Sequence, residues 1–458
     1  MQKRFMPARF GSTLAESGHH LGGSEFERGK TLARRAHKLI PGGAHTYAKG
    51  DDQYPEHSPS FIVRGKGCHV WDMDGNEFIE YGMGLRSVTL GHAYPAVIAA
   101  AAAQMQHGVN FVRPAPIEVE CAERFLESVP TAEMVKFAKN GSDALDGAVR
   151  LARAHTGRDF IAICADHPFF SVSDWFIGRT PMPGGVPEWT RSRTVSFRYD
   201  DLASVQALFD QYPDQIACLV LEPARLNEPS PQFLPQLKEL CGRHGALLVF
   251  DEMITGFRWH RAGAQHVYGV VPDLSTFGKG IANGFSLSAL AGRREIMELG
   301  GYDHERERVF LLSTTHGAET HTLAAGIATM NVYRDEDVVG HLHRQGARLR
   351  NGVRAAAEAA GVRTHVDCVG RDCALLFTTL DGEGRPSQAF RTLFMQELIQ
   401  RGILAPSFMV SYSHSDEDID YTIDAVAEAL RVYRRALDEG VEQFVVGRPI
   451  KPVFRARG

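Results

Sequence analysis

The chain has 458 residues, of which 44% are hydrophobic and 23% are charged, and its formal net charge is −5 at pH 7. This composition is typical of a globular protein with a sizeable core and excludes the fibrous and intrinsically disordered classes. Nothing in the charge balance resembles the basic surface that nucleic-acid binding requires, so we expect no nucleic-acid partner. The length predicts two or three structural units.

Seven cysteines are scattered along the chain, and no two of them form a Cys-x-x-Cys pair. They are Cys68, Cys121, Cys164, Cys218, Cys241, Cys368 and Cys373. Their odd number and wide spacing predict reduced thiols in the core of a cytoplasmic protein. The histidines show no His-Glu-x-x-His motif or other convincing ligand set, so we expect no metal.

The N-terminal region lacks the apolar segment of a signal peptide. The longest aliphatic run, residues 96–103, is much shorter than the roughly 20 residues needed to cross a bilayer. We therefore predict a buried helix at this run and no membrane partner.

In chain order, the first predicted element is an amphipathic helix over residues 24–40, which Pro41-Gly42-Gly43 ends. Alternating apolar and polar residues over 61–81, interrupted by Asp74-Gly75, then predict a β-hairpin.

The middle of the chain alternates short apolar runs with helical stretches, which predicts a parallel β-sheet covered on both faces. The predicted strands are residues 134–138, 160–164, 217–221 and 246–250. Two of these strands end at an acid, Glu222 or Asp251, and ligands of α/β sheets bind at the carboxyl ends of strands. The steps from Glu222 to Asp251 and from Asp251 to Lys279 each span about 30 residues, one strand–helix unit. We therefore expect these three side chains in one row.

The pattern changes after residue 325, where a long helix over 338–360, a strand over 374–380 and two further helices predict a smaller α+β unit. Ser415 followed by Asp418 predicts a capping box at the start of the last helix. Before this unit, the segment 174–199 is either a mobile lid or a static loop.

Two segments carry a resemblance to a known family, namely Leu247 to Arg258 (LLVFDEMITGFR) and Pro272 to Gly280 (PDLSTFGKG). They resemble the class III aminotransferases of pyridoxal 5'-phosphate (PLP) fold type I, and among them glutamate-1-semialdehyde 2,1-aminomutase in particular. The resemblance implies an α/β large domain with a mainly parallel seven-stranded sheet, a smaller α+β domain, and a homodimer with shared active sites. It implies domain boundaries at residues 1–80 (contributing to the small domain), 81–325 (the large PLP-binding domain) and 326–458 (the C-terminal small domain).

The same resemblance implies that Lys279 holds PLP as a Schiff base and that Asp251 lies beside the pyridine nitrogen. A carboxylate there keeps the nitrogen protonated, so that the ring can absorb electrons when the proton leaves the α-carbon. Lys279, once released by the substrate, is placed to move that proton. Either residue alone would more often be structural, but their joint context indicates catalysis.

Gly141 and Ser142 stand between a predicted strand and a predicted helix, where backbone amides can bind the cofactor phosphate. The alternative is an ordinary N-cap formed by Ser142 and Asp143. By resemblance, Thr315 reaches the phosphate across the dimer interface, and Phe169 stacks on the ring without the hydrogen bond that a tyrosine would add.

Three further residues match pocket positions of the family. Glu222 and Asn227 belong to its Glu-Pro-x-x-x-Asn pattern, although a glutamate at a strand end could equally be a solvated loop residue. Met253 matches the position that packs on one face of the ring, but a methionine is more often core filling.

The substrate region departs from the aminomutase, in which an arginine after Pro-Gly-Gly grips the far carboxylate. Here Lys49 follows Pro41-Gly42-Gly43, and lysine cannot reproduce the bidentate fork of arginine. We therefore predict transfer from a separate amino donor to another small aldehyde or ketone, sugar-like or cyclic, with Thr46 and Lys49 as substrate contacts. The aminomutase reaction, which needs no separate donor, and a non-catalytic subunit of the same fold are the alternatives, but both Lys279 and Asp251 are present, which disfavours the latter.

Overall fold

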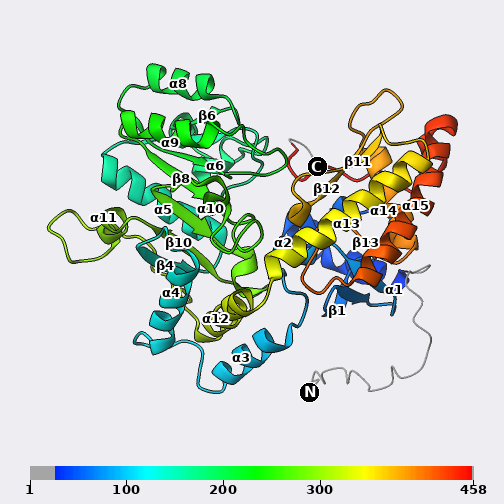
Figure 1. Ribbon diagram of the computed structural model, residues 1–458, viewed down its shortest axis with the longest axis horizontal. Coiled ribbons are helices and arrows are strands. Elements are labelled where there is room, and N and C mark those ends of the chain that lie inside the picture. The colour runs from blue at the N-terminus through cyan, green and yellow to red at the C-terminus, as the bar shows by residue number, and fades with distance from the viewer. Residues whose placement is uncertain (1–25, 456–458) are drawn as a thin grey trace.

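A computed structural model describes residues 26–455, which form two lobes side by side (Figure 1). One lobe is built around a seven-stranded sheet and the other around a four-stranded sheet with long helices. In this described part of the chain, no helix is both long and apolar enough to span a membrane. All seven cysteines are buried and free, as predicted.

The seven-stranded sheet has the strand order β4-β10-β9-β8-β7-β5-β6. Its strands are β4 (Met134–Ala138), β5 (Phe160–Cys164), β6 (Thr194–Phe197), β7 (Ile216–Leu221), β8 (Leu247–Asp251), β9 (Leu274–Phe277) and β10 (Ser288–Gly292). All neighbours pair in parallel except β10, which is antiparallel to both β4 and β9. The mainly parallel seven-stranded sheet is therefore confirmed, and β7, β8 and β9 are buried along their whole length, as strands covered on both faces must be.

Helices cover this sheet and connect its strands. They are α2 (Met83–Arg86), α3 (Pro95–Met105), α4 (Pro116–Ser128), α5 (Gly141–Thr156), α6 (Asp174–Ile177), α7 (Glu188–Ser192), α8 (Leu202–Gln211), α9 (Phe233–Arg243), α10 (Ala264–Tyr268), α11 (Arg294–Met297) and α12 (Thr320–Asp335). Helix α5 packs on β7, β9 and β10, and α12 packs on α3 and α4. The segment 174–199, for which lid and static loop were both open, contains α6, α7 and the edge strand β6.

The prediction of a buried helix at residues 96–103 is wrong in part. The helix forms as α3, but among its residues only Val97 and Ala101 are buried. Ile98 is 44% exposed and Met105 is 54% exposed. An aliphatic run shows that a segment is apolar. It does not show whether the surface that covers the segment belongs to the same chain or to another one.

The smaller lobe joins residues from both ends of the chain. Strands β1 (Ile62–Lys66), β2 (His69–Asp72) and β3 (Glu77–Glu80) form an antiparallel meander, to which β13 (Ile403–Leu404) adds in parallel. A second sheet consists of β11 (Val366–Val369) and β12 (Leu376–Thr379). The helices are α1 (Glu27–Ala36), α13 (Val338–Ala359), α14 (Gln388–Gln400) and α15 (Asp416–Glu439).

The local predictions for this lobe are confirmed where the structure describes them. The hairpin turns between β2 and β3, and α1 ends before Pro41, while residues 24 and 25 of the predicted first helix lie outside the described residues. Ser415 and Asp418 form the capping box of α15. The expected domain boundary at residue 325 falls inside α12, and since α12 packs on α3 and α4, we propose that the large domain extends to the end of this helix.

Candidate active site

The two residues expected to carry the chemistry lie at the carboxyl ends of adjacent strands. Asp251 is the last residue of β8, and Lys279 begins the turn that follows β9. Strand β7, which precedes Glu222, neighbours β8 on its other side. The three side chains therefore follow three adjacent strands, as their spacing predicted, and Asp251 and Glu222 are both buried.

The backbone at Lys279 has an unusual conformation, with a φ of 46°. Positive φ is uncommon for a residue other than glycine, and such conformations cluster at functional sites. The glycines on either side are required by packing. A Cβ at Gly278 would lie 2.5 Å from the Met253 sulfur, and one at Gly280 would lie 2.7 Å from Oγ1 of Thr89.

Burial and mutual charge determine the ionisation of the site. Burial raises the pKa of Asp251 to about 7, and the nearby Glu222 carboxylate acts in the same direction while Lys279 opposes it. Burial lowers the pKa of Lys279, against the attraction of Asp251 and Glu222. A lysine with a lowered pKa presents more of the neutral amine, which is the nucleophilic form.

The carboxylates of Asp251 and Glu222 each have an oxygen without a hydrogen-bond partner in the described part of the chain. Asp251 Oδ1 accepts from the Met253 backbone at 3.0 Å and from Thr276 Oγ1 at 3.4 Å. Both hydrogen bonds that residues 26–455 donate to Asp251 end on Oδ1 and none on Oδ2, while Glu222 Oε2 is buried without a partner. A protonated ring nitrogen would satisfy such an oxygen and would restore the ionised form of Asp251. The residues present therefore fit PLP.

The N-terminus of α5 provides the expected phosphate position. Asn140, rather than Ser142, is the N-cap, and its Oδ1 accepts from the Asp143 backbone at 3.1 Å. This leaves the backbone donors of Gly141 and Ser142, which the helix itself does not use, for an anion. The Ser142 hydroxyl accepts from the Val172 backbone at 3.1 Å, so it also ties α5 to the loop that carries Phe169.

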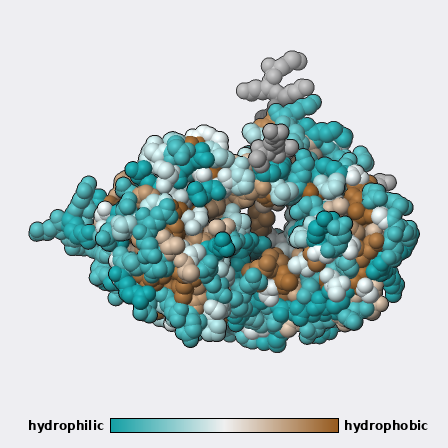
Figure 2. Space-filling model, turned by 90° about the horizontal axis from the view of Figure 1, so that it is seen from above, coloured by the Kyte–Doolittle hydropathy of each residue, from teal (hydrophilic) through white to brown (hydrophobic). Residues whose placement is uncertain are grey.

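Lys279 lines a cavity of about 450 Å³ between the lobes, where the surface is hollowed (Figure 2). The lining residues are Ala48, Gln53, Tyr54, Gly82, Leu85, Arg86, Pro168, Phe169, Glu222, Arg225, Ile254, Lys279, Gln388, Arg391, Pro406, Ser407, Ile450, Lys451, Pro452 and Val453. Phe169 is 43% exposed there and stacks on Phe454 with ring centroids 6.5 Å apart. The cavity therefore combines Lys279, Glu222 and Phe169, with Asp251 buried behind them.

Other expected residues lie elsewhere. Asn227, Thr46 and Lys49 are exposed and are not among the lining residues, although Ala48 is. Met253 is buried, and its sulfur lies so close to two glycines that a Cβ at Gly141 or Gly278 would be only 3.0 or 2.5 Å from it. This placement suits both core filling and contact with a ring.

Thr315 is exposed and lines a different cavity of about 610 Å³, where its carbonyl accepts from Asn110 Nδ2 at 3.0 Å. It does not reach the Lys279 cavity of its own subunit, and a role at the phosphate would require a second copy of the chain.

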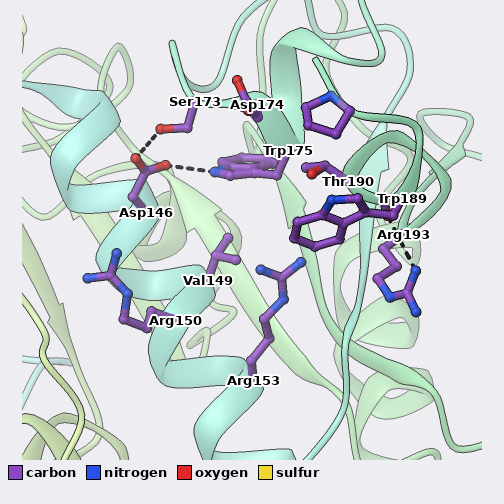
Figure 3. Close-up of a pocket in the computed structure, with 11 residues that line it drawn as sticks. Asp146, Val149, Arg150, Arg153, Ser173, Asp174, Trp175, Trp189, Thr190 and Arg193 are labelled. Carbon is purple, nitrogen blue, oxygen red and sulfur yellow. Dashed lines mark hydrogen bonds between the residues drawn. The ribbon is translucent and has the colours of Figure 1, made fainter. Parts of the chain in front are cut away.

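A carboxylate of α5 supports the loop that carries Phe169 (Figure 3). Asp146 accepts from Trp175 Nε1 at 2.7 Å, from Ser171 Oγ at 2.9 Å and from the Ser173 hydroxyl. These bonds fasten residues 169–175 to the same helix whose N-terminus holds Gly141 and Ser142. A third cavity, of about 380 Å³, has Asp146, Ser173 and Trp175 among its lining residues (Figure 3).

Sequence reasoning missed the cationic residues of the Lys279 cavity and the C-terminal segment 450–453. Arg225 could have been found, because it follows the strand end at Glu222 by three positions. Arg86 and Arg391 stand far from any motif in the sequence, and only the tertiary structure brings them to Lys279.

One group of side chains in the smaller lobe has the composition of a metal site, namely Cys68, His69 and Asp418. Their contacts have another purpose. The His69 ring lies between Asp418 (Nε2 to Oδ1, 3.0 Å) and Glu77 (Nδ1 to Oε1, 2.9 Å), and the Cys68 thiol donates to Asp418 Oδ2 at 3.3 Å. The group joins the β2–β3 hairpin to the start of α15.

A family model for class III aminotransferases matches residues 51–430. The chain belongs to the class III aminotransferase family. It is 34% identical over 427 residues to glutamate-1-semialdehyde 2,1-aminomutase of Syntrophobacter fumaroxidans, an alignment that covers 88% of this chain and 97% of that protein. Class III enzymes use PLP, which stabilises the negative charge that develops when a bond to the amine-bearing carbon breaks.

Solved structures agree with this membership. The FumI protein of Sphingopyxis sp. MTA144 has a TM-score of 0.83 at 28% identity, over 90% of this chain and 98% of its own. An ω-transaminase from Sphaerobacter thermophilus has a TM-score of 0.79 at 27% identity, over 89% of this chain and 98% of its own. The protein is thus an enzyme of the PLP-dependent transaminase or aminomutase type.

Proposed function

We propose that this enzyme transfers an amino group from a separate small-molecule donor to a small polar aldehyde or ketone of sugar-like or cyclic type. The observation that carries the proposal is the half-buried Lys279 and the buried Asp251, which follow adjacent strands beside an open cavity of about 450 Å³. The cavity admits a second molecule after the first has left, which an intermolecular transfer requires. Half of its lining residues are polar or charged, and these side chains can hydrogen-bond to a hydroxylated substrate.

Each residue has a distinct task in this proposal. Lys279 Nζ holds the cofactor covalently and afterwards takes and returns a proton at the reacting carbon. Asp251 Oδ2 holds a protonated ring nitrogen. Gly141 and Ser142 bind the phosphate with backbone donors. Phe169, on the loop fastened by Asp146, covers the ring and keeps water from that side.

A second candidate is the aminomutase reaction, in which the amine returns to a neighbouring carbon of the same molecule. The 34% identity to a glutamate-1-semialdehyde 2,1-aminomutase favours it. Lys49 stands against it, because the aminomutase family has an arginine there. Incubation with glutamate-1-semialdehyde alone separates the two, since only a mutase turns it over without another amino donor or acceptor.

The first experiment tests the chemistry at Lys279. Borohydride treatment of the holoenzyme should bleach its visible absorbance and label Lys279, which peptide mass spectrometry would locate. The Lys279→Ala variant should lose the label and at least about 10³-fold in the rate of amino transfer. A panel of amino donors with hydroxylated and cyclic ketones then identifies the acceptor. A label on another lysine, or undiminished turnover by the variant, would overturn the proposal.

We also propose a homodimer with shared active sites. Two residues that line the cavity with Thr315, Phe111 and Val112, are exposed and apolar, and Ile98, Met105 and Val119 on α3 and α4 are exposed as well. Exposed apolar side chains in such number on one part of the chain favour a protein interface there. A second copy seated there would bring its own Thr315 toward the α5 N-terminus, as in the family resemblance.

A further inference from the structure

The catalytic cavity carries more positive charge than a neutral substrate needs. Besides Lys279, it is lined by the cations Arg86, Arg225, Arg391 and Lys451, whereas Glu222 is its one carboxylate. A concave surface lined by one sign of charge attracts ligands of the opposite sign. The excess therefore points to an anion in the cavity.

The partners of these cations single out Arg86. Arg391 donates to the Pro406 carbonyl at 2.6 Å and lies over the Phe377 ring at 4.6 Å. Arg225 lies 3.7 Å from Glu222 Oε1. The Arg86 side chain forms neither an ion pair nor a hydrogen bond with any residue between 26 and 455. It is therefore the guanidinium of the cavity that is free to bind a ligand.

The backbone that holds Arg86 in this position is in a conformation of unfavourable free energy. Its helix, α2, contains three residues at positive φ: Met83 (44°), Leu85 (58°) and Arg86 (74°). Such backbone conformations are unfavourable for residues other than glycine and persist where the surroundings enforce them. Burial lowers the pKa of Arg86 to about 10, and the neighbouring Arg225 acts in the same direction. A half-buried cation without a partner is likewise unfavourable until an anion joins it.

The position of Arg86 relates it to the reacting centre. Its charge lowers the pKa of Lys279 and opposes the protonation of Glu222. An anion held by Arg86 would therefore lie within electrostatic reach of the reacting amine. Because a guanidinium presents two parallel N–H donors, it matches the two oxygens of a carboxylate.

We propose that Arg86, assisted by Arg225, is a carboxylate-binding subsite, so that the enzyme's amino donor or acceptor is an amino or oxo acid. This inference rests on the proposed function and narrows one of its two substrates to a molecule that carries a carboxylate near the reacting amine or carbonyl.

The test measures binding without turnover. Pentanoate and pentanamide have nearly the same shape but differ in charge, and neither has an amine that can react. Calorimetric titration of the wild-type holoenzyme should give a dissociation constant for pentanoate that is about 10- to 100-fold lower than that for pentanamide, as a charged hydrogen-bonded pair provides. Arg86→Gln should abolish this preference and leave pentanamide binding unchanged.

Two further variants make the result specific. Arg86→Lys keeps the charge without the fork and should retain only part of the preference, and it serves as the test if Arg86→Gln does not fold. Arg371→Gln removes the same charge at a residue paired with Glu228 outside the cavity, and should leave the preference intact.

Failure of the two proposals can be told apart. Equal binding of pentanoate and pentanamide by the wild-type enzyme, or a preference that survives in both Arg86 variants, would overturn the subsite whatever the enzyme's turnover. If instead no amine reacts with the holoenzyme while the pentanoate preference follows Arg86, the aminotransferase proposal fails and the subsite stands.

Discussion

Asp251 shows how one residue joins fold and chemistry. Its place at the end of β8 follows from the buried apolar run before it, and its buried carboxylate has one oxygen without a partner. We expect Asp251→Asn to keep the fold but to lose about 10²- to 10³-fold in kcat, because an amide cannot stabilise a protonated ring nitrogen as a carboxylate does. Steady-state kinetics and the circular dichroism spectrum check this.

The matched control for Asp251 is Glu222→Gln, which changes a buried carboxylate on the neighbouring strand in the same way. Its effect should be smaller, since Glu222 interacts with Arg225 rather than with the expected ring nitrogen. An Asp251→Asn enzyme as active as the wild type would contradict the role. At this scale the motif residues Lys279 and Asp251 were predictable from sequence. Arg86 was not, because its significance depends on neighbours from distant segments.

At the scale of elements, apolar runs predicted four strands of the sheet, and these four run in the same direction, as expected. The predicted bounds of β4 and β5 agree with the structure to the residue, because each is a short apolar run between turn signals. Strands β6 and β9 contain hydroxyl residues at half of their positions and gave no such run. The residues of β10 do not predict that this strand is antiparallel to its neighbours, because its direction depends on which strands it pairs with.

The cluster that joins the β2–β3 hairpin to α15 makes a pH-dependent contribution to stability. The hydrogen bond with Asp418 raises the pKa of His69, and Glu77 adds to this effect while burial opposes it. When folding raises the pKa of a group, the group contributes its full stabilisation to the folded state at pH values below its unfolded-state pKa. This contribution is lost as the pH rises through the folded-state pKa. The contribution of His69 is therefore present at pH 6 and smaller at pH 9.

We accordingly expect His69→Gln to lower the free energy of unfolding by about 1–2 kcal/mol at pH 6, as for a hydrogen bond to a charged group, and by less at pH 9. Urea unfolding at both pH values measures the difference. The exposed His45 provides the control, since His45→Gln should change neither value. An equal loss for His69→Gln at pH 6 and pH 9 would show that the ring acts by packing rather than by charge.

At the scale of the whole molecule, the exposed face of α3 and the position of Thr315 have one common explanation. Ile98 and Met105 leave an apolar surface on α3, and Thr315 lies away from the Lys279 cavity of its own subunit. A single sequence cannot distinguish a helix covered by its own chain from one covered by a second copy. The prediction of a buried α3 therefore failed for the single chain, and the proposed dimer would account for both observations.

The proposed shared site predicts complementation between two defective subunits. Light scattering should give the mass of a dimer, and Thr315→Ala should weaken PLP binding by roughly 10- to 100-fold through the loss of a hydrogen bond to a charged phosphate. In a mixed dimer of Lys279→Ala and Thr315→Ala subunits, the site with intact Lys279 receives its Thr315 from the other subunit, so mixing should restore activity at low PLP concentration. If Thr315 served its own subunit, the mixed dimer would contain no intact site and mixing would restore nothing. Because each parent homodimer is defective at both sites, recovered activity can come only from a site built by two chains.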